Sequence, residues 1–543
     1  MNREMNVTEK KKTDPSICLE NTQWFDVLVL GSGIAGISAA IAASKEGMRV
    51  ALACKGKLFS GSSFYPGTWG LGLIGPEQED DQEDLIRSIE TVGCGMADDS
   101  MVRAFVSGIR PAIEQVEQMG VKLRKAQAGA DQKEYIPCFD HKHRAWNGIE
   151  FDSAREKFEE QLKAGNVTIC PGFEALELVK TEGRVCGAVI SNGTELHFLP
   201  AKSTVLATGG YGSLFQHHLC TSDVEGSGQG LAMDAGCRLI NMEFMQIMAG
   251  YLSPAYGTIF NEKVFRFTHL EAQGEALLSH QPELFALRSG HGPFTSRLDS
   301  RAIDLAICAH PEGVTVRYDE SLRMDPPEFV KTYFDWLKEA KGLTMDDPVR
   351  IGLFAHAANG GVRIDPDAFT GIPGLFAAGE VTGGMHGADR IGGLSTANGL
   401  VFGTKAGISA AKNAKAAPEP LSSWKFSTLG ITDARKQFSE LQAVMTEHAM
   451  AIRKEEGLKK ALCKVQEIRE HTKEPMESIR ELTVSRRLDA QLKTATAILS
   501  AQLLRKESRG SHYREDYPLE HATYSKPILL KEDSDRIYAE ILA

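Results

Sequence analysis

The stretch from residue 25 to residue 54 decides the fold, and it begins FDVLVLGSGIAGISAAIAA. Its first six residues predict a buried parallel strand, and the small residues after the glycines predict a helix. The segment MRVALAC at 48–54 predicts a second strand. A G-x-G-x-x-G turn between a strand and a helix is typical of a dinucleotide-binding unit.

The glycines of this turn have separate roles in such a unit. Gly31 allows the tight turn, Gly33 lets the backbone approach a pyrophosphate, and Gly36 lets helix and strand pack closely. Ile34 and Ala35 begin the helix, where free N–H groups and the positive dipole end favour phosphate. The turn therefore predicts a site for NAD or FAD.

Residues beyond the turn favour FAD. An NAD-binding unit usually closes its second strand with an acidic residue, but Cys54 and Lys55 occupy that position. Two further strands end in glycine, TVLATGG at 204–210 and GLFAAGE at 374–380. Glu380 is a candidate for binding the ribose hydroxyls, and the glycine-dense run at 383–395 offers a third backbone cradle before a helix.

Composition limits the class of protein. The 543 residues are enough for about two to four domains, and the net charge of −11 argues against a nucleic-acid partner. The ten Cys form no C-x-x-C pair, which indicates a reducing compartment and no iron–sulfur cluster of its own. The apolar run at 27–43 is interrupted by glycines, so we expect no transmembrane segment and a cytoplasmic protein.

Six segments together resemble one family. They are DVLVLGSGIAG, LATGGYG, MEFMQ, HAANGGVRID, LFAAGEVTGGMHGADRIGG and RKESRGSHYREDYP, in this order. They are similar to the flavoprotein subunits of succinate dehydrogenase and fumarate reductase and to L-aspartate oxidase. The resemblance implies an α/β fold with a split Rossmann-like FAD-binding domain, an inserted α+β capping domain and a C-terminal helical domain.

The expected domain boundaries follow from the resemblance and from a glycine-poor, helix-like composition after residue 430. We expect a flexible tail at 1–23, the FAD-binding domain at 24–242 and 355–415, the capping domain at 243–354 and the helical domain at 416–543. Besides the first turn, the residues expected to bind FAD are Lys55, Ser62, Ser63, Gly67, Ala207, Thr208, Gly209, Gly379, Glu380, Arg390 and Ser395. The run SGSSFYPG at 60–67 contains no His, so the FAD should be non-covalent.

The resemblance also implies three catalytic residues. The segment FTSRLDSRAID places the proton-transfer Arg at Arg297, HAANGGV places a carboxylate-binding His at His356, and GADRIGG places the main carboxylate-binding Arg at Arg390. A guanidinium offers a planar fork for a carboxylate, but its high pKa means that proton transfer needs a special setting. Arg301, one turn later, is expected to be structural.

One departure from the family changes the expected substrate. Met248 occupies the position of a substrate-binding His after MEFMQ, and the Thr that usually helps bind the second carboxylate has no recognisable counterpart. A thioether is only a weak acceptor and donates no hydrogen bond. The substrate pocket of Met248, His356 and Arg390 therefore predicts a substrate with one carboxylate and an apolar far end.

The sequence leaves three functions open. The first is reduction of a carbon–carbon double bond next to a carboxylate, or the reverse; the second is oxidation of an amino acid. The third is a subunit that passes electrons to an iron–sulfur partner.

His143 and Arg144 are weaker candidates for residues near the flavin. Arg509, His512 and Arg514 are expected at a domain interface, and Gln229 replaces a family Asp. A homo-oligomer is also possible on sequence grounds.

Overall fold

A seven-stranded sheet forms the centre of the structure, a computed structural model that describes residues 15–68, 70–125, 135–534 and 536–542. Its strands are β2 (Phe25–Leu30), β3 (Val50–Cys54), β7 (Thr168–Pro171), β8 (Glu174–Thr181), β9 (Arg184–Ser191), β10 (Leu196–Leu206) and β18 (Leu375–Ala377). The order is β7-β3-β2-β10-β9-β8, and β18 pairs with β10. β2 and β18 both run parallel to the end of β10, so the carboxyl ends of three distant segments meet at one edge. Ligands bind at this edge in open α/β sheets.

The predicted strand–turn–helix unit is present at residues 25–45. β2 leads into α1 (Ile34–Lys45) through the glycine turn, and Gly31 adopts a φ of +112°. A Cβ atom on Gly31 would lie 2.2 Å from the Ala207 carbonyl oxygen, and one on Gly36 would lie 1.9 Å from the Gly31 carbonyl oxygen. Both positions therefore exclude any larger residue, as the close approach of helix and strand requires.

Helix α10 (Leu394–Ala416) packs along α1 and against the same sheet. Three glycines, four residues apart, lie on the contacting face of α10. Cβ atoms on Gly403 and Gly407 would lie 2.4 Å and 2.3 Å from the carbonyl oxygens of Ala35 and Ala39, and Gly399 faces the Ile34 side chain. The two helices therefore meet backbone to backbone, which holds the start of each beside the glycine turn.

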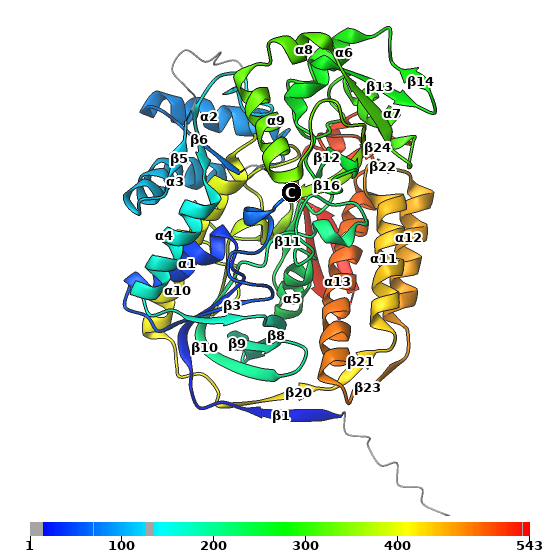
Figure 1. Ribbon diagram of the computed structural model, residues 1–543. Coiled ribbons are helices and arrows are strands. Elements are labelled where there is room, and N and C mark those ends of the chain that lie inside the picture. The colour runs from blue at the N-terminus through cyan, green and yellow to red at the C-terminus, as the bar shows by residue number, and fades with distance from the viewer. Residues whose placement is uncertain (1–14, 69, 126–134, 535, 543) are drawn as a thin grey trace, which may run out of the picture.

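A second, five-stranded sheet belongs to the inserted capping domain at the top of Figure 1. Its order is β12-β16-β15-β13-β14. The elements are β12 (Met245–Ser253), β13 (Thr268–Ala272), β14 (Glu275–Leu277), β15 (Val314–Tyr318), β16 (Val349–Ala358), α6 (Pro282–Arg288), α7 (Arg301–Cys308), α8 (Glu320–Met324) and α9 (Glu328–Lys341). The expected boundary at residue 354 lies inside β16, which is one continuous strand.

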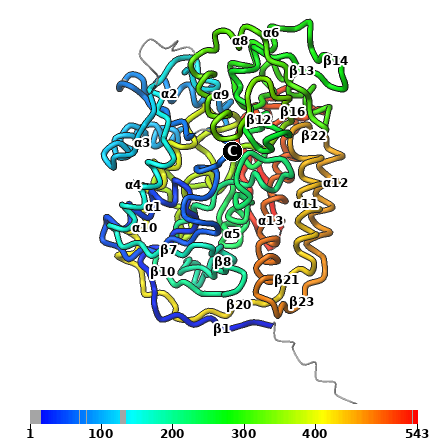
Figure 2. The backbone as a smooth tube through the Cα atoms, in the orientation of Figure 1, coloured from blue at the N-terminus to red at the C-terminus, as the bar shows by residue number. Residues whose placement is uncertain are grey.

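Three helices, α11 (Ala434–Ala449), α12 (Glu455–Arg469) and α13 (Ile479–Leu504), pack on one another on one side of the molecule. Figures 1 and 2 show them side by side, in yellow to orange. All three lie in the part of the chain after residue 430, where the sequence composition is helix-like. Short strands connect them, with β21 (Leu429–Ile431) pairing with β23 (Lys473–Pro475) and β22 (Ile452–Arg453) pairing with β24 (Tyr513–Arg514).

Two segments differ from the expected organisation. Within the expected tail at 1–23, β1 (Ser16–Glu20) is a strand that pairs antiparallel with β20 (Ser423–Ser427); residues 1–14 lie outside the described part. Within the expected helical domain, β25 (Ile528–Asp533) and β26 (Arg536–Ile541) form a hairpin that joins β11 (Leu239–Ile240). β17 (Gly361–Arg363) and β19 (Thr382–Gly383) complete this five-stranded sheet. Both pairings satisfy backbone groups over long sequence separations, which local patterns do not reveal.

The remaining elements surround the first sheet. They are β4 (Leu71–Gly75), β5 (Leu123–Arg124) and β6 (Ala145–Ile149) in a three-stranded sheet, and helices α2 (Glu79–Val92), α3 (Asp99–Gln118), α4 (Phe151–Ala164) and α5 (Ser227–Ala235). Among the helices in the described ranges, none combines the length and apolar character that a membrane span needs.

Candidate active site

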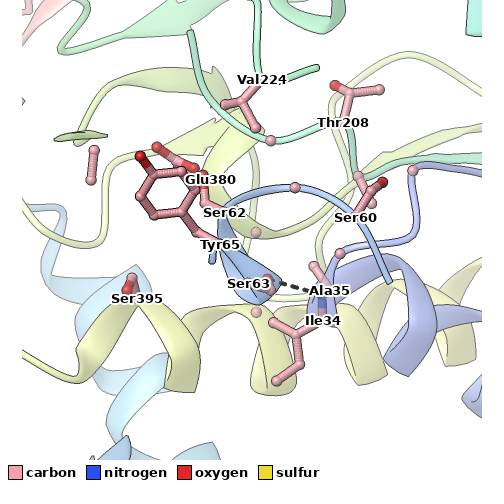
Figure 3. Close-up of a pocket in the computed structure, with 18 of the residues that line it drawn as sticks. Ile34, Ala35, Ser60, Ser62, Ser63, Tyr65, Thr208, Val224, Glu380 and Ser395 are labelled. Carbon is pink, nitrogen blue, oxygen red and sulfur yellow. Dashed lines mark hydrogen bonds between the residues drawn. The ribbon is translucent and has the colours of Figure 1, made fainter. Parts of the chain in front are cut away.

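One cavity extends from the glycine turn to the capping sheet and collects most of the predicted site residues. The predicted residues that line it are Gly31, Gly33, Ile34, Ala35, Lys55, Ser62, Ser63, Ala207, Thr208, Gly209, Met248, His356, Gly379, Glu380, Arg390 and Ser395. Figure 3 shows part of this wall. Gly36, Gly67 and Arg297 are not in the lining: Gly36 packs beneath the turn and Gly67 packs against Tyr65.

The phosphate end of the cavity is built from backbone N–H groups. Helix α1 has no side-chain cap at its N-terminus, and the Ile34 N–H donates to Ser63 Oγ at 3.1 Å (Figure 3). Ser63 lies on the short 3-10 helix η1 (Ser62–Phe64), and a Cβ on Gly33 would be 3.4 Å from its hydroxyl. An uncapped helix start beside hydroxyl groups suits a pyrophosphate.

Unpartnered polar atoms in the same cavity fit the rest of an FAD molecule. Thr208 Oγ1 and Asp223 Oδ1 are buried, line the cavity and form no hydrogen bond in the described structure. Buried polar atoms without partners are costly, so a polar ligand is expected to satisfy them. Sequence reasoning missed Asp223. Its half-buried carboxylate is a second candidate for the ribose hydroxyls beside Glu380, whose Oε1 accepts from the Ala358 N–H at 2.9 Å.

Arg390 lies buried at the other end of the cavity. Its Nη2 donates to Gln246 Oε1 at 2.6 Å, and within the described ranges it forms no ion pair. Burial lowers the pKa of Arg390 to about 10, although the charge of Glu380 opposes the shift. The guanidinium stays charged at neutral pH, and a buried charge without a counter-ion is unfavourable. Arg390 is therefore ready to bind an anionic group of a ligand.

His356 projects from β16 into the same end of the cavity. Burial and the nearby charge of Arg390 lower the pKa of His356 to about 3, so the imidazole is neutral at physiological pH. Its Nδ1 is buried without a hydrogen-bond partner in the described structure. A neutral imidazole can accept or donate one hydrogen bond to a substrate, but it adds no positive charge.

The wall beyond His356 is apolar. Met248 on β12 is paired with Phe354 on β16 and forms a buried cluster with Phe354 and Leu219. Tyr65 and Ile259 pack against this cluster. Cys138, which sequence reasoning did not identify, also lines the cavity, and its thiol donates to Glu262 at 3.1 Å. The described residues of this cluster therefore offer no cation to a second carboxylate.

Arg297 lies beside the cavity and not in its lining. Its Nε donates to Asp389 Oδ2 at 3.1 Å, and its guanidinium stacks over the Phe139 ring at 5.9 Å. Burial would lower the pKa of Arg297, but the charge and hydrogen bond of Asp389 outweigh burial and raise it. Asp389, which sequence reasoning also missed, directly precedes Arg390. Its ion pair with Arg297 therefore links the capping domain to the loop that carries Arg390. The Asp389 carboxylate therefore keeps Arg297 in its charged, protonated form.

The weaker candidates have structural partners. Arg144 is fully buried and binds three carboxylates, those of Asp81, Asp84 and Asp140. His143 is near Glu77, and Arg301 donates to the Ser296 carbonyl. These residues lie outside the cavity lining.

The expected interface residues lie in a buried network near the cavity. Arg509 pairs with Glu507, His512 contacts Arg453, and Arg514 pairs with Asp516. The Gly510 carbonyl accepts from the Ser296 N–H at 2.8 Å. The loop of the helical domain therefore contacts the capping segment that carries Arg297.

Two family models match the chain. The model described as FAD binding domain matches residues 26–396, and the model described as fumarate reductase flavoprotein C-term matches residues 438–539.

Gln229, at the position where the resemblance leads us to expect an Asp, donates to the Gly209 carbonyl at 3.1 Å at the edge of the cavity.

Curated relatives match over nearly the whole chain. One component of the fumarate reductase (CoM/CoB) of Methanothermobacter marburgensis is 29% identical, covering 93% of this chain and 96% of its own length. L-aspartate oxidase of Halobacterium salinarum is 30% identical, covering 90% and 96%. L-aspartate oxidase of Vibrio cholerae is 27% identical, covering 93% and 98%.

Solved structures share the fold. The Mycobacterium smegmatis Sdh1 complex contains a chain with a TM-score of 0.76 and 23% identity, covering 96% of this chain and 94% of that one. A quinol fumarate reductase variant of E. coli gives a TM-score of 0.75 and 22% identity, with 96% of both chains covered.

Proposed function

The chain belongs to the family of FAD-dependent oxidoreductases that contains the L-aspartate oxidases and the flavoprotein subunits of succinate dehydrogenase and fumarate reductase. From this premise we propose that it acts on a carbon–carbon bond next to a single carboxylate. The observation that carries the proposal is the contrast between the two ends of the substrate pocket. Arg390 is a buried cation without an ion pair in the described structure, whereas Met248, Leu219 and Phe354 form an apolar wall.

The residues of the chain have distinct parts in this proposal. The glycine turn would hold FAD, which would supply hydride-transfer chemistry at one carbon of the substrate, so a side chain of the protein would have to exchange the proton at the neighbouring carbon. Arg390 binds the carboxylate, and neutral His356 orients it by a hydrogen bond. We assign the proton to Arg297, held beside the cavity by Asp389. The apolar wall excludes water and receives the far end of the substrate.

A second carboxylate would be poorly bound in this pocket. Placed against Met248, it would find no cation among the described residues of the cluster, and the neighbouring Tyr65 hydroxyl already donates to the Gly257 carbonyl. Burial of an unpaired carboxylate costs several kcal/mol. Fumarate, succinate and aspartate are therefore expected to be poor substrates. The 30% identity to an L-aspartate oxidase supports a second candidate, oxidation of an amino acid whose side chain is apolar.

The test uses the holoenzyme under anaerobic conditions. The flavin is photoreduced, and its reoxidation is followed with crotonate, cinnamate and fumarate; the oxidised enzyme is mixed separately with apolar amino acids. We expect a monocarboxylate to reoxidise the flavin at least about 100-fold faster than fumarate, equivalent to about 3 kcal/mol. Fumarate turnover equal to that of the monocarboxylates contradicts the proposal, and flavin reduction by an amino acid favours the second candidate.

Variants at two positions sharpen this test. Met248→His supplies a donor at the apolar wall and should raise fumarate turnover, whereas Met248→Leu keeps the wall apolar and should leave the preference unchanged. Arg390→Gln should lower kcat/KM for every carboxylate by about 100-fold, or about 3 kcal/mol, because it removes the buried cation. If Arg390→Gln turns over substrate normally, the assignment of Arg390 is wrong.

A further inference from the structure

A second cavity, of about 490 Å³, lies between the helical domain and the first sheet. It is bounded by the turn at 192–194 between β9 and β10, by the first turn of α11 and by the N-terminal half of α13. Helix α13 contributes residues 480, 483, 484, 487, 488 and 491, which share one face because they recur every three or four positions. The cavity is separate from the one described above, and we call it the α13 cavity.

The charge of the α13 cavity is mainly positive. Three of its lining residues are arginines: Arg435 at the start of α11, and Arg480 and Arg487 on α13. Arg435 and Arg480 are exposed and form no ion pair within the described residues, while Arg487 pairs with Glu174, the one carboxylate in the lining. The first turns of α11 and α13 both border the cavity, although Asp433 before α11 and Glu481 in the first turn of α13 partly offset their positive dipole ends. Because the chain has a net charge of −11, the gathering of three arginines at the α13 cavity is unusual and indicates an anionic ligand.

A buried donor without a partner lies in the wall of the α13 cavity. The side chain of Gln491 is 1% exposed, and its Nε2 has no hydrogen-bond partner in the described structure. An amide N–H that is buried and unsatisfied destabilises the fold by about 1–3 kcal/mol. A ligand that carries an acceptor oxygen would satisfy this N–H group while its charge pairs with the arginines.

The α13 cavity shares a wall with the FAD cavity. Glu174 lines both cavities, and it accepts from Arg487 on one side and lies 3.6 Å from Lys55 Nζ on the other. Glu225 binds the same two cations, with Arg487 Nε 3.2 Å from its Oε1. Any anion that draws Arg487 toward the α13 cavity therefore weakens a contact of the carboxylates that hold Lys55 at the FAD cavity.

We propose that the α13 cavity binds a small anion with a carboxylate or phosphate group, held by Arg435, Arg480 and Gln491, and that its occupancy is coupled to FAD binding through Arg487 and Glu174. The coupling is reciprocal, since an anion that changes the affinity for FAD must itself be bound with an affinity that depends on FAD. This site does not depend on the reaction proposed above.

Calorimetric titration of the holoenzyme at constant ionic strength tests the proposal, with inorganic phosphate and citrate as separate probes. We expect saturable binding of at least one probe, weakened at least tenfold in the Arg435→Gln/Arg480→Gln double variant and severalfold in Gln491→Leu. Arg238→Gln, which removes an exposed arginine outside the cavity, is the matched control and should bind normally. The probe that binds shows whether the group is a phosphate or a carboxylate.

Binding of the probe to the active site must be distinguished from binding to the α13 cavity, because Arg390 can also bind a carboxylate. The titrations are therefore repeated in Arg390→Gln, where binding to the α13 cavity should persist. Binding that is lost in Arg390→Gln but kept in the double variant overturns the proposal, as does the absence of saturable binding of either probe. A bound anion should also change the dissociation constant of FAD in the wild type and not in the double variant; an unchanged constant refutes the coupling.

Discussion

At the scale of single residues, burial shifts the pKa values of Asp389 and Arg390 toward each other. Burial raises the pKa of Asp389 to about 6, despite the opposing charge of Arg297 and the hydrogen bond from Thr295. Burial also lowers the pKa of Arg390 to about 10. Both groups are ionised at neutral pH, but Asp389 gains a proton at a much higher pH than an exposed carboxyl would.

This shift predicts the pH dependence of activity. As the pH falls through about 6, Asp389 becomes protonated and loses the charge that holds Arg297, so kcat/KM should fall with a one-proton limb near pH 6. His356, with a pKa of about 3, should add no limb above pH 5. The measurement is kcat/KM from pH 5 to 8 in the wild type and in Asp389→Asn, where the limb should disappear. A limb that persists in the variant would assign it to another group.

At the scale of elements, α1 and α10 pack closely beside the cofactor cavity. Glycines on α10 let its backbone touch the carbonyls of α1, and both helices start beside the glycine turn. Overpacking in a close-packed contact forces backbone shifts that destabilise a protein by about 1–3 kcal/mol. Any such shift at this contact also moves the N–H groups that face the phosphates.

Gly403→Val tests this contact. The added Cβ would lie 2.4 Å from the Ala35 carbonyl oxygen, so we expect a loss of about 3 kcal/mol in unfolding free energy and weaker FAD binding. Lys412→Val places the same β-branched residue at an exposed position of the same helix and should cost less than about 1 kcal/mol. Urea unfolding and flavin retention on desalting measure both effects. Equal losses in the two variants would show that the close contact is unimportant.

The elements that could be predicted are those with a strong local signal. The strand β2, the glycine turn and α1 carry an apolar run and a glycine fingerprint, and the helices after residue 430 have few helix-breaking residues. The pairing of β1 with β20 has no such signal, because its strength depends on a partner about 400 positions away. At the site, motif order selected Arg390 and His356, which line the cavity, while their catalytic roles stay predictions. Asp223 and Cys138 reach the cavity through loops whose path no local pattern encodes.

At the scale of the whole molecule, several buried histidines control the response to acid. Burial lowers the pKa of His291 and His356 to about 3, and it lowers the pKa values of His386 and His512 well below the ordinary value. In the unfolded chain these groups bind protons near pH 6.5. Between pH 6.5 and 3 the unfolded state therefore holds more protons than the folded state, and stability must fall as the pH falls.

Urea unfolding at pH 7, 6 and 5 checks this expectation. The midpoint should decrease at each step, and His291→Gln should reduce the dependence by removing one of the neutral histidines. His280→Gln, at an exposed position, should leave the dependence unchanged. Asp389 acts in the opposite direction between pH 3.8 and 6, since its raised pKa makes the folded state hold a proton, and burial raises the pKa values of Glu177, Glu225, Asp234, Asp304 and Glu380 in the same sense. His217 and His218, whose pKa values burial lowers, add to the effect of the four histidines. A midpoint that rises toward pH 5 would contradict the account.

The hairpin of β25 and β26 has a consequence for how the protein is made. β11 pairs with β25, so the sheet that contains residues 239–240 can be completed only after residues 528–533 have been synthesised. The cofactor cavity, in contrast, is lined only by residues between 30 and 399 among those that the structure describes. The residues that line the cavity are therefore all synthesised before the hairpin that completes the sheet at β11.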